Sequence, residues 1–376
     1  MIRGLQIRLL PTKEQEVQMF KTIGACRFAW NWALAYNIKY YEENKKSISK
    51  VDLRKIFNQI KKQEFEWIIQ YSSQSIANEF ENLNVAFKKF FKKEAKFPRF
   101  KKKKDVRQSF YVRNDNININ QTNGTLNIEK IGRVKYKSDR KIPKNVKYSN
   151  PTASYNGKYW ILSFGIEVEK QDVQLTDKSI GIDLGIKTLA TCSDGMTFGN
   201  INKSKKVKEL TKRLKRVQRS ISRKYKMNKD GNKFIKTKNI IKAEKKAKLI
   251  SKKLTDIRNN HLHQTTNAIV KQLPNKIVLE DLNVKGMMKN RHLSKAIGEC
   301  SFYEFRRQIE YKAEQYGIEV ILADRFYPSS KTCCKCGQIK SDLKLSDRLY
   351  ICDCGNIIDR DLNASKNLSQ YEIKTK

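Results

Sequence analysis

The stretch Ser179-Ile180-Gly181-Ile182-Asp183-Leu184-Gly185-Ile186-Lys187 decides the fold that this sequence predicts. It is an apolar run that carries one acid, Asp183, and it predicts a buried strand that points this acid inward. Gly185 lets the chain turn after the strand, so residues 189–198 are expected to complete a hairpin. A single acid at a strand end is more often a cap or an ion-pair partner, so the rest of the chain decides the role of Asp183.

Two further acids stand at comparable places. Glu280 follows the apolar residues 277–279, which predict a buried parallel strand, and Asp361 opens the last helix. A helix near 301–316 and a strand over 318–323 separate them. The resulting order is strand with Asp, hairpin, strand with Glu, helix, strand, helix with Asp, which an RNase H-type α/β fold needs to bring three carboxylates together. Carboxylate oxygens suit Mg²⁺, and two such ions about 4 Å apart activate a water and stabilise a leaving 3′-oxygen. We therefore predict a two-metal nuclease site at Asp183, Glu280 and Asp361.

The net charge of +41, from 79 Lys and Arg against 38 Asp and Glu, favours a polyanionic partner, because self-repulsion opposes the compact state. Residues 201–260 hold 23 basic residues and 4 acids, and predict two antiparallel helices around a turn at 228–232. Residues 88–107 hold 11 basic residues and 2 acids interleaved with Phe, which predicts a strip where cations meet phosphates and rings stack on bases. The candidate contacts in these two segments are Lys88, Lys89, Lys101, Lys102, Lys103, Arg213, Arg216, Arg219 and Arg223.

Membrane proteins and secreted proteins are disfavoured. The sequence has no run of about 18 apolar residues, and residues 1–8 lack the uninterrupted apolar stretch of a secretory signal. With 39% apolar residues the chain can bury a core in spite of its charge. We expect a cytoplasmic protein that binds RNA or DNA, with no membrane partner and no small-molecule substrate. A basic protein of the membrane surface is the weaker alternative.

Five of the eight cysteines lie between residues 333 and 354. Two tight thiolate pairs, each next to a glycine, are typical of a zinc ribbon, because tetrahedral Zn²⁺ takes four such ligands. We predict that Cys333, Cys336, Cys352 and Cys354 bind a structural zinc, with Cys334 as the alternative to Cys333. The second pair is one residue shorter than usual. Disulfides are the weaker alternative, because nothing else in the chain indicates an oxidising compartment.

The first half of the chain predicts helices followed by a small β-domain. Residues 2–10 alternate as a strand, and Thr12 with Gln15 predicts a capping box for the helix that follows. A second helix is predicted over about 75–93. Short strands are predicted between 106 and 166, with a hairpin turn at Asn156-Gly157, and strand 2–10 is expected to join them.

The chain resembles the TnpB family, the RNA-guided nucleases that bacterial and archaeal insertion sequences encode and that are related to type V CRISPR effectors. The stretches that carry the resemblance are 2–15, 27–34, 96–101, 181–185, 280–283, 327–333 and 359–364. The resemblance implies an α+β multidomain fold. A wedge β-barrel-like domain would comprise 1–11 and 106–175, with a helical recognition domain inserted at 12–105. An RNase H-like (RuvC) α/β nuclease domain would comprise 176–376, with a basic helical insert at 201–270 and the zinc ribbon at 328–357.

By motif position, the catalytic residues of the family fall on Asp183, Glu280 and Asp361, all of which are acidic here. The resemblance further implies a guide RNA from the transposon end, recognition of a short target-adjacent motif on double-stranded DNA, and Mg²⁺-dependent hydrolysis of guide-complementary DNA. By analogy the motif is read by the helical and wedge domains. Our candidates there are Ser73, Gln74 and Asn78, for which ordinary helix capping is the alternative. Such a protein belongs to the prokaryotic cytoplasm, associated with the nucleoid.

Three other functions account for parts of the sequence. A transposase uses the same type of site for strand transfer, because water and a 3′-hydroxyl can use the same metals, and only the resemblance favours hydrolysis. A non-enzymatic zinc-ribbon RNA-binding protein accounts for the charge and the cysteines but not for three strand-placed carboxylates. Actin-like ATPases also contain Gly-Ile-Asp-Leu-Gly, but they need a second Gly-rich phosphate loop, which the sequence lacks.

Overall fold

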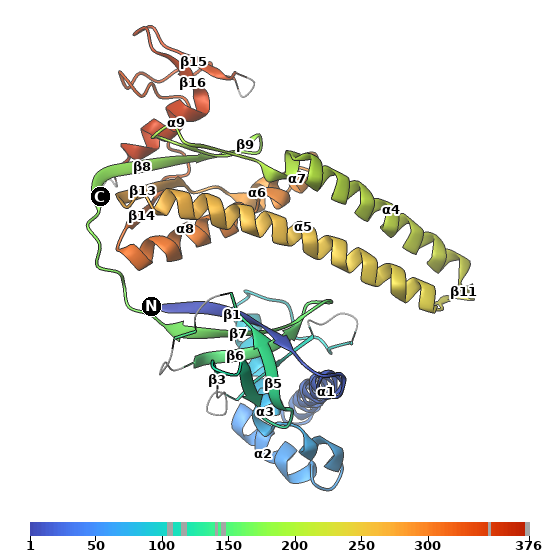
Figure 1. Cartoon of the computed structure of the whole chain (residues 1–376). Coiled ribbons are helices and arrows are strands. Elements are labelled where there is room, and N and C mark those ends of the chain that lie inside the picture. The colour runs from blue at the N-terminus through green and yellow to red at the C-terminus, as the bar shows by residue number, and fades with distance from the viewer. Residues whose placement is uncertain (104–107, 114–118, 140–141, 144–147, 345–346, 373–376) are drawn as a thin grey trace. The chain divides into compact units, whose positions relative to one another are not determined.

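The computed structural model describes residues 1–103, 108–113, 119–139, 142–143, 148–344 and 347–372. They form two compact units, Met1–Val168 and Glu169–Lys376 (Figure 1). Each unit has hydrophobic cores of its own. Across the described ranges, no helix combines the length and the apolar character that a bilayer crossing requires.

The first unit contains a seven-stranded antiparallel sheet among its described residues. In spatial order its strands are β2 (Gln108–Tyr111), β6 (Tyr148–Tyr155), β7 (Trp160–Glu167), β1 (Ile2–Leu10), β5 (Gly132–Lys137), β4 (Thr125–Ile128) and β3 (Ile119–Asn120). The opening strand β1 pairs with β7 and β5, so it joins this sheet as expected. Its residues Leu5, Ile7 and Leu9 are buried, because alternate side chains of a strand share one face. Within the range 106–166 where short strands are predicted, residues 106–107, 114–118, 140–141 and 144–147 lie outside the described residues.

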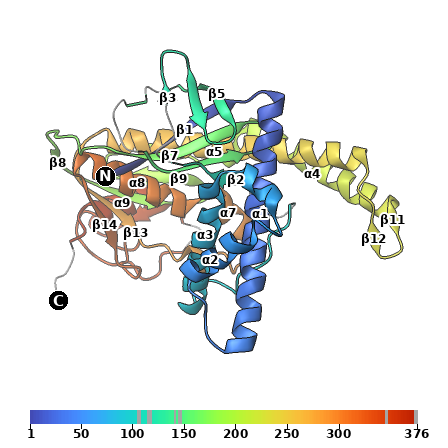
Figure 2. The same ribbon diagram turned by 90° about the horizontal axis from the view of Figure 1, so that it is seen from below.

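The helices of the first unit form a second core. They are α1 (Lys13–Asn44), α2 (Lys50–Ile60), the 3₁₀ helix η1 (Glu66–Gln70) and α3 (Ser73–Phe91), and Figure 2 shows α1, α2 and α3 together. The predicted capping box is confirmed, because Thr12 accepts a bond from the Gln15 amide while the Gln15 side chain accepts one from the Thr12 amide. The predicted second helix is α3. Helix α2 was not predicted from the sequence, because only two of its residues, Leu53 and Phe57, are buried and two positions make a weak apolar pattern.

The second unit contains a five-stranded mixed sheet among its described residues. In spatial order its strands are β10 (Thr197–Gly199), β9 (Thr188–Cys192), β8 (Thr176–Leu184), β13 (Pro274–Glu280) and β14 (Glu319–Ala323). Strands β8, β13 and β14 are parallel, whereas β9 and β10 continue from β8 as antiparallel neighbours. The hairpin and the two parallel strands therefore follow in the order that the sequence predicted.

Helices cover both faces of this sheet. They are α5 (Lys238–Val270), α7 (Ser294–Cys300) and α8 (Phe302–Tyr316) on one face and α9 (Arg360–Ser369) on the other (Figure 1). From β8 and β13, the residues in the core with α5 and α8 are Ile180, Ile182, Ile277 and Leu279. Because strand side chains alternate, the intervening residues face α9: Gly181, Asp183, Val278 and Glu280.

Helix α9 lies so close to β8 that Gly181 has no room for a side chain. A β-carbon built there would stand 2.0 Å from the carbonyl oxygen of Ser365 and 2.3 Å from the amide nitrogen of Ser369. Both neighbours are backbone atoms of α9, which cannot move without shifting the helix. Glycine at position 181 therefore sets the separation between the helix and the strand.

Two long basic helices form an arm of the second unit. Helix α4 (Lys205–Met227) packs antiparallel against the first half of α5, around a core that includes Val207, Ile250 and Leu254. The short strands β11 (Lys229–Asp230) and β12 (Lys233–Phe234) close the tip, at the predicted turn. Figures 1 and 2 both show the arm extending beyond the sheet. Because α5 is continuous from the arm into the core beneath the sheet, the arm has a rigid base.

The remaining elements of the second unit are short. They are the 3₁₀ helix η2 (Ile201–Lys203), α6 (Val284–Met287), and the hairpin of β15 (Leu349–Ile351) with β16 (Ile357–Asp359). The hairpin lies between β14 and α9 in the chain and carries part of the cysteine cluster.

Substitution of Gly181 by alanine tests the close packing of α9. Overpacking against backbone atoms costs about 3 kcal/mol or more, so we expect G181A to lower the midpoint of thermal unfolding by several degrees. G199A is the matched control in the same sheet, because a β-carbon at Gly199 meets nothing within 4 Å. Equal melting of the two variants would contradict the proposed role of Gly181.

Candidate functional site

Asp183 and Glu280 end two neighbouring parallel strands. The register of β8 and β13 pairs Ile182 with Leu279, so the next residue of each strand is one of the two acids. Neighbouring strands are about 4.8 Å apart, and both acids are on the face that α9 covers. The sheet therefore places the two carboxyl groups side by side, although 97 positions separate them in the sequence.

Asp361 stands in the first turn of α9. The Asp359 carboxylate caps this helix, since its Oδ1 accepts bonds from the amides of Asp361 and Leu362 at 2.9 and 3.1 Å. The cap fixes where the helix begins and hence where Asp361 is presented. The guanidinium groups of Arg360 and Arg348 lie 3.5 and 4.0 Å from the Asp361 carboxylate.

Glu280 and Asp361 lie close enough to Asp183 for their charges to affect its ionisation. Burial raises the pKa of Asp183 well above its ordinary value, and the negative charges of Glu280 and Asp361 raise it further. Burial also raises the pKa of Glu280, where a hydrogen bond from Ser329 acts in the opposite direction and Asp361 adds to the rise. The structure thus brings together all three acids that the sequence singled out.

The environment of Asp183 fits a bound cation. This half-buried carboxylate accepts no hydrogen bond from any residue that the structure describes, although it faces two other acids. Such an arrangement costs free energy unless a positive charge is added, and a divalent ion supplies that charge. Asp183, Glu280 and Asp361 offer only oxygen donors, which is the ligand chemistry that Mg²⁺ takes.

Four sulfur atoms gather in a separate cluster. The Sγ atoms of Cys333, Cys336, Cys352 and Cys354 all lie within 4.8 Å of one another. Cys333 and Cys354 are 3.7 Å apart, and Cys336 and Cys352 are 3.5 Å apart. A tetrahedral ion with sulfur at 2.3 Å has S···S edges of about 3.8 Å, whereas a disulfide requires about 2.05 Å. The described chain has no disulfide at any of the eight cysteines, so the cluster could hold a metal ion.

The turns around this cluster explain which cysteines belong to it. Gly337 and Gly355 have φ of 77° and 80°, and their amides donate to the carbonyls of Cys333 and Cys352 at 2.9 Å, which closes two tight turns. Cys334 lies outside the four-sulfur group, and its amide donates to Asn363 Oδ1 of α9. The structure therefore selects Cys333 over Cys334, which the sequence left open.

The cysteines of this cluster differ in their pKa values. Burial acts to raise the pKa of Cys333, but hydrogen bonds from the amides of Cys336 and Lys335 and from Asn356 outweigh it and lower the pKa to about 6. At Cys352 the Cys354 amide acts to lower the pKa, but burial and the neighbouring sulfurs raise it to about 12. A cation that compensates the negative charge would allow all four groups to become thiolates.

The basic segment after α3 is largely exposed. Lys88, Lys89, Lys102 and Lys103 are exposed, as are the rings of Phe91, Phe97 and Phe100. Lys101 differs from its neighbours. Its Nζ lies 2.5 Å from Glu79 Oε2 and 3.9 Å from the centre of the Trp30 ring. Since its ammonium is paired inside the first unit, Lys101 is less available to phosphates than the exposed lysines beside it.

The solvent face of α4 is strongly basic. Its apolar residues pack against α5, and the predicted contacts Arg213, Arg216, Arg219 and Arg223 are exposed on the rest of the surface. No described acid forms an ion pair with any of the four arginines. A shallow hollow of about 700 Å³ is lined by Lys215, Gln218, Arg219, Ser222 and Arg223. These cations are available to phosphates.

The three candidate motif readers lie in the first turns of α3. Ser73 is exposed, whereas Gln74 and Asn78 are half-buried and share a face of the helix. The helix is capped by Ser72 rather than by Ser73, since the Ser72 hydroxyl accepts a bond from the Ser75 amide. Capping thus leaves the side chains of Ser73, Gln74 and Asn78 unused.

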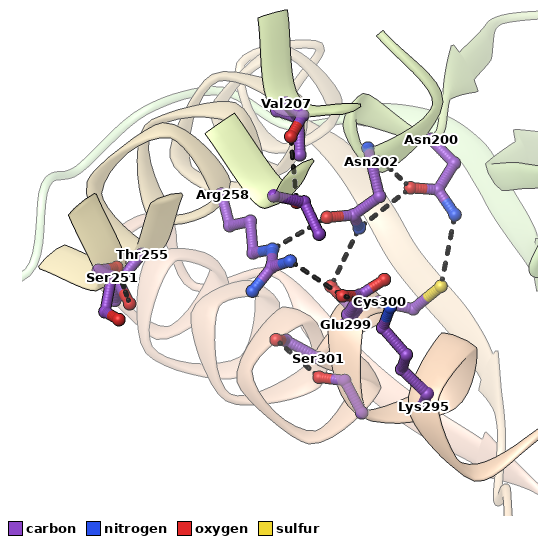
Figure 3. Close-up of polar contacts among 12 residues, drawn as sticks. Asn200, Asn202, Val207, Ser251, Thr255, Arg258, Lys295, Glu299, Cys300 and Ser301 are labelled. Atoms are coloured by element: carbon purple, nitrogen blue, oxygen red, sulfur yellow. Dashed lines mark hydrogen bonds and ion pairs between the residues drawn. The ribbon is translucent and has the colours of Figure 1, made fainter. Parts of the chain in front are cut away.

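A polar network joins the arm to the sheet (Figure 3). Arg258 of α5 donates to Asn202 Oδ1 at 2.7 Å and pairs with Glu299 of α7 at 3.1 Å. Asn200 donates to the carbonyl of Ile186, three residues after Asp183, and to Cys300 Sγ. The base of the arm is thereby tied to the turn that follows the first candidate catalytic acid.

Several residues of the site carried no recognisable sequence pattern. Ser329 donates its hydroxyl to Glu280 Oε1 at 2.8 Å, and Asn363 and Asn367 of α9 bind the loop that contains it. Ser329 and Asn363 lie within the stretches 327–333 and 359–364 that carry the family resemblance, which is the only indication of their importance that the sequence provides.

The chain matches three family models. Residues 163–291 match "Probable transposase", residues 302–368 match "Cas12f1-like, TNB domain", and residues 1–46 match "Helix-turn-helix domain". In this structure residues 1–46 contain β1 and the single continuous helix α1, so the name of the third model does not describe the local fold.

Several similar proteins match almost the whole chain, and others match about half of it. A "Putative RNA-guided DNA endonuclease" of Streptomyces pristinaespiralis is 31% identical, covering 97% of this chain and 88% of that protein. "Putative RNA-guided DNA endonuclease InsQ" of Escherichia coli K12 is 30% identical, covering 98% and 91%. "TnpB-like protein L79" of Acanthamoeba polyphaga mimivirus is 28% identical, covering 54% and 39%. Among solved structures, "Cryo-EM structure of the Cas12f1-sgRNA-target DNA complex" shares the fold with a TM-score of 0.52, at 15% identity and 98% coverage of both chains.

Replacement of Asp183 by Asn should stabilise the metal-free protein. The folded state raises the pKa of Asp183, so the ionised group costs stability, and this cost appears as the pH rises above the ordinary Asp pKa of about 3.9. In EDTA we expect D183N to melt above the wild type at pH 8, with the difference vanishing as the pH falls towards 4. D177N, at the exposed start of the same strand, is the control. A lower melting temperature of D183N at pH 8 would refute this account of the site.

The cysteine cluster predicts the metal content of single variants. We expect about one bound zinc per wild-type chain, because four clustered thiolates are its preferred ligands. C336S and C354S should lose most of this metal and melt at a lower temperature, whereas C334S should keep it, since Cys334 is outside the cluster. Elemental analysis of the purified proteins measures the difference. Equal metal loss in C334S would mean that the cluster is assigned wrongly.

Proposed function

Because the chain belongs to the TnpB family, whose relatives are named RNA-guided DNA endonucleases, we propose that it is the RNA-guided DNA endonuclease of an insertion sequence. It would bind a guide RNA from the transposon end, recognise a short motif beside the target, and cleave guide-complementary DNA. The observation that carries the proposal is the meeting of Asp183, Glu280 and Asp361 on the α9 face of the sheet. A protein that only binds RNA has no need of three mutually repelling acids.

We assign Asp183, Glu280 and Asp361 as the holders of Mg²⁺. When bound, two such ions supply an activated water and stabilise the leaving 3′-oxygen of the phosphodiester. The protein contributes three carboxylates, and bound cations would relieve the burial and the repulsion that raise the pKa of Asp183. Arg348 and Arg360, beside Asp361, offer further positive charge to a phosphate at the edge of the site.

The basic surfaces account for the nucleic-acid partners. The exposed cations of 88–103 and of α4 would contact phosphates of the guide RNA and of the target DNA. The exposed rings of Phe91, Phe97 and Phe100 would stack on bases. We propose Ser73, Gln74 and Asn78 as readers of the target-adjacent motif, because their side chains are not engaged in capping α3.

We propose that the chain is divided as the family resemblance implies. The sheet of the first unit would be the wedge domain, at 1–11 and 106–175, and its helices at 12–105 the recognition domain. Residues 176–376 would be the RuvC-like nuclease domain, with the basic insert at 201–270 and a structural zinc ribbon at 328–357. Two observations support the assignment of residues 176–376: the four clustered cysteines, which could hold a metal ion, and the mixed sheet of the second unit.

Strand transfer is the second candidate activity. Residues 163–291 match a model described as a probable transposase, and the same carboxylates could serve a 3′-hydroxyl as well as water. The two reactions leave different products, because hydrolysis yields free ends and transfer yields a joined strand.

The proposal is tested with the protein and the RNA that co-purifies with it. Sequencing should return one discrete RNA species that ends in a variable guide, and the complex should cut DNA complementary to that guide in the presence of Mg²⁺. D183A should lower the cleavage rate by more than about 1,000-fold while target binding is retained, because the loss exceeds that of a single electrostatic donor.

D177A is the matched control and should cleave like the wild type. A random mixture of RNA, or cleavage that survives D183A, would refute the nuclease assignment. End-labelled products that contain a joined strand would assign strand transfer instead.

A further inference from the structure

Glu280 is oriented by a buried serine. Ser329 is 4% exposed, and its hydroxyl donates to Glu280 Oε1 at 2.8 Å. This bond occupies one carboxylate oxygen, fixes the side-chain rotamer, and leaves the other oxygen for a ligand. It also couples Glu280 to the loop 327–334, which leads directly to the first turn of the cysteine cluster.

The loop itself is held by two buried asparagines of α9. Both hydrogens of the Asn367 amide are used, since its Nδ2 donates to the carbonyls of Ser329 and Thr332 at 2.7 Å each. Asn363 donates to the Thr332 carbonyl at 2.6 Å and accepts a bond from the Cys334 amide at 3.0 Å. Asn363 is fully buried and Asn367 is 3% exposed, so these bonds form where water cannot replace them.

The same helix carries the third acid. Asn363 and Asn367 are four residues apart and therefore share a face of α9, and Asp361 lies in the first turn just before them. The opposite contact of α9, against Gly181, holds strand β8 with Asp183. All three carboxylates are thus positioned from one helix: Asp361 directly, Asp183 through backbone packing, and Glu280 through Ser329.

We propose that Ser329 is a positioning residue for Glu280, held in place by Asn363 and Asn367, so that α9, the first cysteine turn and the catalytic carboxylates form one positioning network. This inference rests on the proposed function, since it gives Glu280 a cation to bind. Residues that hydrogen-bond a metal ligand change metal affinity by about 10- to 100-fold when they are removed.

A purely structural role for Ser329 makes a different prediction. The contact that holds the loop uses the backbone carbonyl of Ser329, so S329A keeps that contact and loses only the bond to Glu280. S329T restores a hydroxyl. A structural role would lower the melting temperature of S329A and leave metal affinity unchanged, whereas a positioning role would weaken metal affinity and be rescued by S329T.

The experiment measures Mg²⁺ dependence and Mn²⁺ binding on the full-length protein with its co-purified RNA. We expect S329A to raise the Mg²⁺ concentration for half-maximal cleavage by about 10-fold, with a smaller change in the rate at saturating Mg²⁺. S329T should lie near the wild type. Without DNA, the Mn²⁺ bound by the wild type in excess of E280Q, read by electron paramagnetic resonance, should bind about 10-fold more weakly to S329A. Zinc content and melting temperature should be unchanged.

Two failures are distinguishable. If the wild type cleaves and binds more Mn²⁺ than E280Q, but S329A matches it in both measurements, the positioning role of Ser329 is overturned and the proposed function stands. If the wild type neither cleaves nor exceeds E280Q in Mn²⁺ binding, the proposed function fails and Ser329 has no catalytic partner. A lower melting temperature or zinc content in S329A, without a weaker Mn²⁺ affinity, would assign it a structural role only.

Discussion

The close approach of α9 to strand β8 is the contact on which the candidate site depends. Backbone atoms of the helix occupy the place where a β-carbon of residue 181 would stand, so only glycine permits this separation. The contact fixes the start of α9 relative to the ends of β8 and β13, and therefore fixes Asp361 relative to Asp183 and Glu280. Sheet register alone would bring together two acids, and the packed helix adds the third.

Like charges are concentrated in two parts of this molecule, acids in one and basic residues in the other. Three acids are gathered at one edge of the sheet, where burial and neighbouring negative charge oppose the ionisation of Asp183 and Glu280 and favour a bound cation. A large excess of positive charge covers the α4 surface and the segment after α3, which prepares them for polyanions. In both places repulsion between like charges opposes the compact state, and a bound counter-charge would reduce that repulsion.

Hydrogen bonds link the cysteine cluster to the candidate site. The loop that enters its first turn binds α9 through Asn363 and Asn367 and contacts Glu280 through Ser329. A metal that orders the cysteine turns would therefore also order a loop that touches the candidate site at Glu280. At the other side of the sheet, Arg258 and Asn200 connect the basic arm to the turn after Asp183.

The sequence by itself determined which residues could do chemistry and in what order their elements follow, because apolar periodicity, turn glycines and cysteine spacing are local properties. It identified the three acids, four of the five clustered cysteines, the capping box at Thr12 and the basic hairpin. Only the tertiary structure decided what joins residues far apart in the chain. In the folded chain Cys333, and not Cys334, belongs to the four-sulfur cluster. Lys101 pairs with Glu79, and the Ser329 hydroxyl donates a hydrogen bond to Glu280. Those contacts depend on how sheet, helix and loop pack, and no pattern within any one segment records that packing.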